Sequence, residues 1–184
     1  MKRQFYFLKS VCLLVLMLGI VSCKKEEKVI AESMTITLRL GVYKNDTIQV
    51  FYIKKTDDSY SEELSIKQFV EGKNELQTLN YELPVGVKPK NIRIDLGETA
   101  NYHDSIRIED VILKYRDLAL DGSRGAYKAW FIPNENIYFD SDTLVHRLQI
   151  HNDIYDPQLN GNQLLNTKII KLFPPDVNEQ YFNE

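Results

Sequence analysis

The sequence predicts a single all-β domain, folded as a jelly-roll-like antiparallel β-sandwich of about eight strands. Apolar and polar side chains alternate through many short segments, which is the period of a strand with one buried face. Segments rich in Gly, Pro, Asn and Asp separate these runs at short intervals, as turns do. Because no rhythm of strand, helix and strand appears, the pattern favours a sandwich over a parallel sheet covered by helices.

The first half of the domain contains the clearest strands. Residues 34–40 place Met, Ile and Leu on one face and Thr and Arg on the other. Residues 48–53 follow a polar turn and are rich in β-branched and aromatic side chains, which favour strands. Residues 64–70 fit either a strand or a helical turn, whereas residues 79–83 and 92–96 return to alternation.

The next strand is expected to be irregular. Its apolar residues alternate through 106–108 and again through 111–115, but Glu109 and Asp110 interrupt the phase between them. Two extra residues at such a point predict a β-bulge, or a bend that carries the chain from one sheet to the other.

The rest of the chain has weaker patterns. Residues 126–132 and 143–150 are two further strand candidates, and residues 163–172 fit either a short helix or an edge strand. We therefore expect the sandwich to span residues 34–155 and to be followed by a partly ordered C-terminal extension, residues 156–184.

The composition is that of an ordinary globular protein, with 43% apolar and 27% charged residues among 184. One domain is the default at this length. Removing residues 1–22 takes away three basic side chains and leaves 20 basic and 26 acidic ones, so the net charge moves from −3 to −6. Nucleic acid is not an expected partner, because clustered Lys and Arg are needed to neutralise its phosphates.

Residues 1–22 have the layout of a signal peptide for export. Residues 1–10 carry three basic side chains and no acidic one, and residues 11–21 are wholly apolar. This run is shorter than the roughly 20 residues of a spanning helix. It ends in Ile-Val-Ser-Cys, which resembles the lipobox of bacterial lipoproteins and implies cleavage before Cys23. The alternative is an uncleaved anchor with an incidental Cys.

Cys23 is therefore the expected lipid attachment site, and residues 23–33 form a charged tether. Each buried acyl methylene contributes about 0.8 kcal/mol, so several chains on one Cys would hold the protein on a membrane. The Lys and Glu residues that follow the Cys resemble the start of lipoproteins of the Bacteroidetes type, in which such residues mark export to the outer face. The alternative is that they form a solvated spacer. We expect a lipoprotein anchored to the outer membrane, and its exposure at the cell surface is a hypothesis that the sequence leaves open.

The mature domain is expected to contain no thiol. The second Cys of the chain, Cys12, lies inside the leader, and Cys23 is consumed by lipid. We therefore expect neither an internal disulfide nor a metal bound by Cys.

Residues 48–115 contain several short motifs in a fixed order. They are Tyr60-Ser61-Glu62, Leu83-Pro84, residues 92–95 (Ile-Arg-Ile-Asp) and residues 106–113. This stretch, about 70 of 184 residues, resembles the β-sandwich, carbohydrate-binding-module-like segments of bacterial envelope proteins, including some glycosyltransferases that assemble polysaccharides. It departs from them after Asp95, where Leu96 and Gly97 replace the usual Pro and Gly. The resemblance implies a jelly-roll-like sandwich associated with envelope glycans, and it carries over no catalytic residue.

Neither a metal site nor another cofactor is expected. His146 and His151 are five residues apart, so a strand turns their side chains to opposite faces, and His103 stands alone in a loop. The acidic side chains within residues 57–63 offer oxygen atoms to Ca²⁺, but they lack the loop pattern of an EF-hand, and a solvated acidic loop is favoured.

The sequence also indicates a protein that is not an enzyme. Glu109 and Asp110 are adjacent and would face opposite ways on a strand, which does not suit the facing carboxylates of a glycosidase. The sequence contains no Gly-x-Ser-x-Gly motif, phosphate-binding loop or dinucleotide fingerprint.

An aromatic stretch supplies the candidate ligand-binding residues. Sugar rings present apolar C–H faces, which stack on exposed aromatic rings beside polar groups. Tyr127, Trp130, Phe131 and Asn134 are the candidates. Core packing is the favoured alternative for the rings, since on a strand Trp130 would face away from the other two.

Two functions fit these observations. The first is an envelope lipoprotein that binds a glycan or polysaccharide, which requires an exposed aromatic ring beside convergent polar groups. The second is a structural or partner-binding subunit of an envelope protein complex, which requires an exposed apolar patch or an open edge strand.

Overall fold

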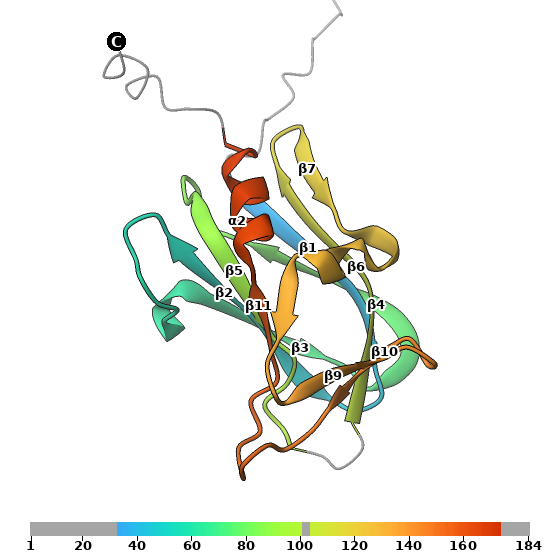
Figure 1. Cartoon of the computed structure of the whole chain (residues 1–184). Coiled ribbons are helices and arrows are strands. Elements are labelled where there is room, and N and C mark those ends of the chain that lie inside the picture. Colours follow the sequence, from blue (N-terminus) through green and yellow to red (C-terminus); the bar gives the residue numbers. More distant parts are fainter. Residues whose placement is uncertain (1–32, 101–103, 174–184) are drawn as a thin grey trace, which may run out of the picture.

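Two antiparallel sheets face each other in the computed structural model, which describes residues 33–100 and 104–173 (Figure 1). Sheet A runs in the order β4 (Lys73–Glu82), β1 (Met34–Val42), β6 (Asp104–Tyr115), β10 (Val145–Leu148) and β9 (Ile137–Asp140), and β7 (Leu118–Asp121) also pairs with β6. Sheet B runs in the order β3 (Ser65–Val70), β2 (Asp46–Lys54), β5 (Pro89–Asp95), β11 (Gln158–Gly161) and β8 (Phe131–Pro133). The all-β sandwich predicted from the sequence is confirmed.

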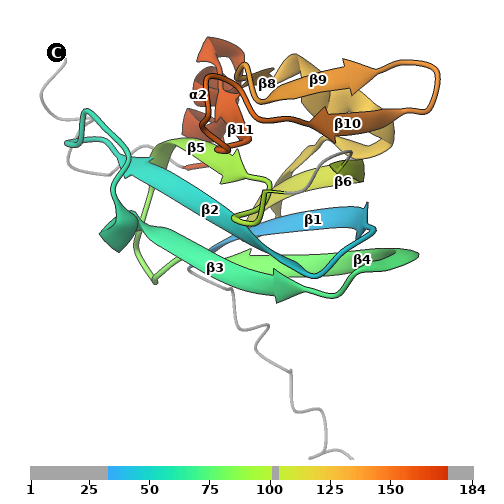
Figure 2. The same cartoon turned by 90° about the horizontal axis from the view of Figure 1, so that it is seen from below.

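The chain crosses between the two sheets repeatedly. β1 lies in sheet A, β2 and β3 in sheet B, β4 in sheet A and β5 in sheet B, and the second half continues this exchange. Strands that follow each other in the sequence therefore often face each other across the core, as in a jelly-roll-like sandwich. Figure 2 shows the two layers from below.

The core lies between the inner faces of the two sheets. The innermost side chains of β1, β2 and β5 are each 0% exposed, and they are Met34, Ile36, Leu38, Leu40, Ile48, Val50, Ile92 and Ile94. Their spacing of two residues is the alternation seen in the sequence. Burying one such side chain contributes roughly 1.5–3 kcal/mol relative to leaving it in water.

The irregular strand β6 contains the predicted bulge. Its pairing with β1 shifts register between Arg39 and Leu40, so Ile108 and Val111 both face the core. The bulge turns Asp110 outward, where its carboxylate accepts a hydrogen bond of 2.5 Å from Arg39. β6 stays in sheet A throughout, so the alternative of a bend between sheets is wrong.

Residues 126–132 do not form the predicted strand. Ser123–Ala129 form the 3-10 helix η2, and only Phe131–Pro133 pair as β8. The reason is local: Arg124 and Gly125, with φ values of 54° and 81°, turn the chain just before this segment, and the Trp130 N–H donates to the Tyr127 carbonyl at 2.8 Å instead of to another strand.

Other strand boundaries also differ from the sequence pattern. The ambiguous segment 64–70 is mostly strand, β3, preceded by the 3-10 turn η1 (Glu62–Leu64). Of the candidate strand 143–150, only Val145–Leu148 form a strand, β10. The sequence pattern does not reveal β7, β9 and β11, because each has four residues, too few for alternation to be recognised.

The sandwich extends beyond residue 155, the boundary expected from the sequence. β11 lies inside sheet B between β5 and β8, and helix α2 (Gln163–Ile170) buries Leu165 and Ile169 in the core. The Asn162 side chain caps α2, because it accepts hydrogen bonds from two backbone N–H groups of the first turn. The short-helix alternative for this segment is confirmed. Within the described ranges, no helix has the length and hydrophobicity needed to span a bilayer.

Leu38→Ala should lower the free energy of unfolding by about 2–5 kcal/mol, because it empties a fully buried position at the centre of β1. Denaturant unfolding followed by fluorescence of the single Trp would measure the change. Leu118→Ala is the matched control, since Leu118 is 51% exposed. The control should change stability by less than about 0.5 kcal/mol. Equal losses in the two variants would contradict this view of the core.

Candidate functional site

The aromatic candidates Tyr127, Trp130 and Phe131 are 1%, 5% and 5% exposed. Residues three apart in a 3-10 helix lie on one side, so η2 turns both Tyr127 and Trp130 inward. Asn134 is half-buried, and its side-chain amide donates to the carbonyl of Asp156 at 2.6 Å. All three rings pack in the core, which agrees with the favoured alternative and removes them as candidates for an exposed ligand-binding platform.

His146 is buried beside one of these rings. Its Nε2 atom lies 2.8 Å from the Tyr127 hydroxyl, and its Nδ1 atom has no hydrogen-bond partner within the described part of the chain. Burial, with a smaller contribution from Lys128, lowers the pKa of His146 to about 4. The imidazole is therefore neutral at neutral pH, which suits its packing against the Phe139 ring at 5.3 Å.

The strongest candidate site is the outer face of sheet B. Strand register places Lys67, Gln49 and Asp95 in one row across β3, β2 and β5. The next row consists of Ser65, Phe51 and Arg93. We call these six residues and their neighbours Tyr60, Glu62, Phe69 and Glu98 the sheet B face.

Arg93 is held from several directions on the sheet B face. Its Nε and Nη2 atoms donate to the two carboxylate oxygens of Asp95, both at 2.8 Å. Its guanidinium carbon lies 4.1 Å from the centroid of the Phe51 ring and 5.1 Å from that of the Tyr60 ring. The two rings meet edge to face, with centroids 6.3 Å apart. A guanidinium that is both paired and stacked keeps its donors in a fixed plane.

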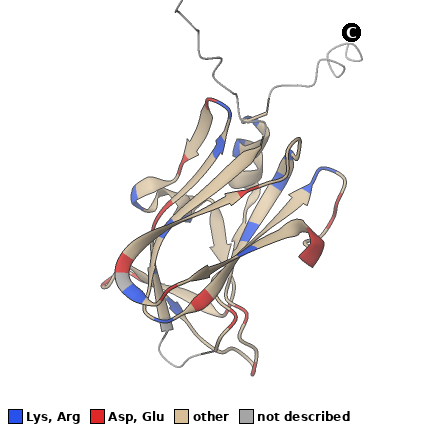
Figure 3. Ribbon diagram, turned by 180° about the vertical axis from the view of Figure 1, so that it is seen from behind, with Lys and Arg blue, Asp and Glu red and all other residues tan. Residues whose placement is uncertain are grey.

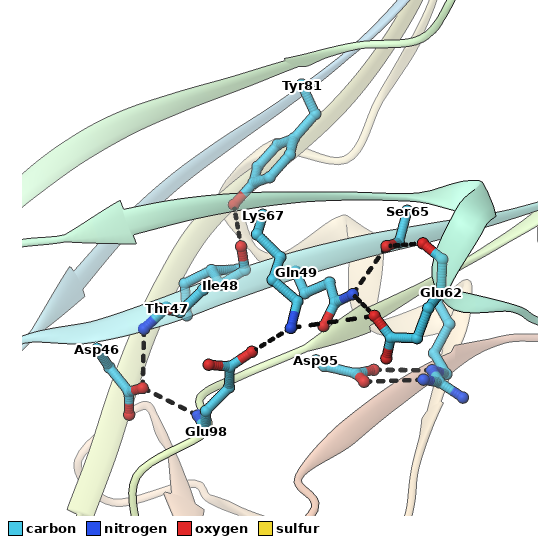
Figure 4. Close-up of polar contacts among 11 residues, drawn as sticks. Asp46, Thr47, Ile48, Gln49, Glu62, Ser65, Lys67, Tyr81, Asp95 and Glu98 are labelled. Atoms are coloured by element: carbon cyan, nitrogen blue, oxygen red, sulfur yellow. Dashed lines mark hydrogen bonds and ion pairs between the residues drawn. The ribbon is translucent and has the colours of Figure 1, made fainter.

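Gln49 is 4% exposed although it points away from the core. Its Nε2 atom donates to the Glu62 carboxylate at 2.9 Å and to the Ser65 hydroxyl at 2.8 Å (Figure 4). The Ser65 hydroxyl donates in turn to the Glu62 carbonyl at 2.7 Å. η1 therefore folds back over β2 and covers its outer face with polar groups.

Lys67 and Glu98 form the more accessible part of the site. Their charged atoms lie 2.6 Å apart, and the side chains are 47% and 50% exposed. The Asp46 carboxylate fixes the position of Glu98, because it accepts a hydrogen bond from the Glu98 backbone N–H at 2.9 Å. Gly97 permits this close approach, since a Cβ atom there would lie 2.5 Å from the Asp46 carboxylate.

Two side chains of the sheet B face have shifted ionisation. Burial raises the pKa of Asp95 to about 6, although the hydrogen bonds and charge of Arg93 act to lower it. Burial likewise raises the pKa of Tyr60 to about 12. Asp95 therefore loses its proton only as the pH rises through about 6, whereas the Tyr60 phenol stays protonated at neutral pH.

Phe69 supplies an exposed ring at the edge of this face. It is 63% exposed and stands opposite Thr47 in the pairing of β3 with β2. Because residues two apart on a strand share a face, the ring lies beside the Lys67–Glu98 pair. An exposed ring next to charged and amide groups is an arrangement that can stack on an apolar surface and bind hydroxyls around it.

Two of the sequence motifs meet at this site, because residues 60–62 and 92–95 both contribute side chains to it. The other members had no comparable signal. Residues 64–70 fitted either a strand or a helical turn, so the outward side chains of β3 could not be assigned from the pattern alone.

The remaining predicted positions lie elsewhere. His151 is exposed on a loop, while Cys23 and His103 lie outside the described residues. Among residues 33–100 and 104–173, no group of three or more His, Cys, Asp or Glu side chains is arranged to hold a metal ion. No family model, curated protein or solved structure matches this chain.

Arg93→Lys should lower the free energy of unfolding by about 1–3 kcal/mol, because Lys can neither pair with both oxygens of Asp95 nor stack flat on the Phe51 ring. Thermal and denaturant unfolding would measure the loss. Arg107→Lys is the matched control, since Arg107 is exposed on β6 of sheet A. The control should stay within about 0.5 kcal/mol of the parent. A similar loss in both variants would show that the contacts of Arg93 do not stabilise the fold.

Acid should destabilise the protein through His146. Its pKa is about 4 in the folded chain against an ordinary value of 6.5, so the unfolded chain binds the proton more readily. This contribution to stability is complete above pH 6.5 and is lost as the pH falls towards 4, by roughly 3 kcal/mol in all. Asp95 acts with the opposite sign, since its raised pKa of about 6 favours the folded, protonated form in acid.

A variant of His146 isolates its contribution to the pH dependence from that of Asp95. His146→Gln should weaken the dependence of the unfolding midpoint on pH between 6.5 and 4, because it removes the titrating ring. His151→Gln is the control, because it replaces an exposed His by the same residue. Identical pH profiles for the parent and His146→Gln would contradict the argument.

Proposed function

We propose that this protein is a non-catalytic lipoprotein of the cell envelope, anchored through Cys23, whose sandwich binds a glycan or polysaccharide through the sheet B face. The observation that carries the proposal is the exposed Phe69 ring, which stands beside the Lys67–Glu98 pair on an otherwise polar sheet face. This combination is the one required of a glycan-binding sandwich.

The chemistry of the face suits a sugar. An aliphatic C–H surface of a sugar ring can stack on Phe69, while its hydroxyls exchange hydrogen bonds with Lys67 and Glu98. The half-exposed ion pair can accept such a ligand, because an exposed pair adds little stability and its members are free to turn to new partners. The Arg93–Asp95 pair provides fixed polar groups on the same face, two strands away from Lys67.

The envelope part of the proposal rests on the N-terminal sequence. A basic start, an apolar run and Ile-Val-Ser-Cys together support cleavage before Cys23 and its lipidation. Lipid on this residue would place the sandwich at the outer membrane, with the charged tether between them. Intact mass measurement of the native protein tests this directly, since an unprocessed and unmodified N-terminus would reject the anchor.

A partner-binding subunit is the second candidate function. It is favoured by Ile132, which is 59% exposed on β8, a short strand at the edge of sheet B. An apolar side chain on an unpaired strand edge suits addition of a strand from another protein. Pull-down from envelope extracts that depends on Ile132 rather than on Phe69 would favour this function.

Phe69→Ala should weaken glycan binding roughly tenfold, which corresponds to loss of one stacking contact of about 1.4 kcal/mol. The assay is a glycan array followed by titration of the best ligand against the chain from residue 24 onward, with circular dichroism as the check of folding. Tyr138→Ala is the matched control, because Tyr138 is 51% exposed on β9 of sheet A. Equal binding by parent and Phe69→Ala, or absence of any sugar-competable binding by the folded parent, would reject this function.

A further inference from the structure

The first and the last described residues of the domain lie at the same end of the sandwich. β1 begins at Met34, which stands opposite Tyr115 in the register of β6. The Phe173 ring, at the other end of the described chain, lies 4.7 Å from the Tyr115 ring. Figure 1 shows α2 and the hairpin of β6 and β7 at this end. We call it the Ser33 end, and define it by residues 33–34, 83–88, 115–118 and 170–173.

Three exposed aliphatic side chains project from separate elements at the Ser33 end. Val85 is 71% exposed in the loop between β4 and β5, Leu118 is 51% exposed after the β6–β7 turn, and Ile170 is 57% exposed at the end of α2. Single exposed apolar residues are ordinary, but three at the tips of neighbouring elements form a surface that water solvates poorly.

Basic side chains surround these tips. The loop after β2 reaches the same end, because Lys54 pairs with Pro89. The basic residues around this end are Lys54, Lys55, Lys88, Arg116, Lys168 and Lys171, against the acidic Asp57, Asp58, Glu82 and Asp117 (Figure 3). The loops at the opposite end have the opposite charge balance, since Glu71, Glu98, Asp153 and Asp156 outnumber Lys44 and Lys73 there. A chain that is acidic as a whole is therefore basic around one apolar tip.

From these observations we propose that the Ser33 end docks on the surface of an anionic lipid bilayer, with Val85, Leu118 and Ile170 at the headgroup level. Apolar tips ringed by Lys and Arg are the chemistry of interfacial membrane binding. The inference rests on the proposed anchor, which supplies the bilayer. Cys23 precedes Ser33 by ten residues, and such a segment spans at most about 35 Å. The anchor thus holds this end, rather than the opposite one, near the lipid.

The test uses the processed, lipidated protein in vesicles of phosphatidylcholine with about one third phosphatidylglycerol. Of the two Cys of the sequence, processing removes Cys12 with the leader and attaches lipid to Cys23, so a new Cys carries a unique fluorescent label. Ile170→Cys and Ile154→Cys are matched sites, 57% and 61% exposed at opposite ends. Lipids with a quencher near the headgroup should quench the label at 170 about threefold more than the label at 154.

Charge reversal provides the second measurement. The double variant Arg116→Glu with Lys171→Glu should remove most of the difference between the two labels, as should high salt or vesicles of phosphatidylcholine alone. Lys44→Glu with Lys73→Glu, at the opposite end, is the matched control and should preserve the difference. Both pairs are exposed, so the fold should tolerate the changes.

The outcomes separate docking from anchoring. Flotation of the chain with vesicles, combined with equal quenching at the two sites, would overturn docking and leave the anchor intact. Quenching at 170 that does not respond to lipid charge would also overturn it, because nearness to the bilayer would then follow from the tether alone. A chain that does not float at all would reject the anchor, and docking with it.

Discussion

The outer face of β2 is the constraint on which the rest of sheet B depends. Phe51 and Gln49 point away from the core, yet they are 3% and 4% exposed, so other parts of the chain must cover them. Arg93 from β5 covers the ring with a guanidinium, and Glu62 from η1 covers the amide with a carboxylate. A buried amide needs such a partner, because leaving it without one costs about 1–3 kcal/mol. A polar face therefore forms on a strand that is almost wholly apolar in sequence.

The burial of β2 on both of its faces also explains how far the sequence could predict the fold. Residues 34–40 of β1 and 92–95 of β5 alternate because one of their faces packs in the core, and the pattern therefore identified their inner residues. Apart from Gln49, residues 48–53 are apolar on both faces, so the pattern identified a strand without indicating what lies over its second face. The cover comes from Arg93 of β5 and Glu62 of η1, and hydrophobic periodicity does not encode such contacts between separate segments.

The candidate site was harder to predict, because aromatic content does not distinguish an exposed ring from a buried one. Tyr127 and Trp130 lie where the chain passes from sheet A to sheet B, and their rings fill the space beneath that crossing. The turn depends on the positive φ of Arg124, which hydrophobic periodicity does not encode. Phe69, in contrast, is a single aromatic residue in an ambiguous segment. Its exposure follows from the register of β3 with β2.

The two proposed surfaces are compatible, because the sheet B face lies on the side of a sheet and the Ser33 end lies at the ends of the strands. The Ser33 end lies at the tips of the strands, whereas Asp95 ends β5 six residues beyond Pro89, which is about 20 Å along the strand. Phe69 and Lys67 lie towards the same far end, since Val70 pairs with Asp46 at the start of β2. A sandwich resting on lipid through its Ser33 end would therefore hold the accessible part of the sheet B face away from the bilayer. The acidic loops beside that face would also be repelled by an anionic surface, so the charge distribution favours the same orientation as the anchor.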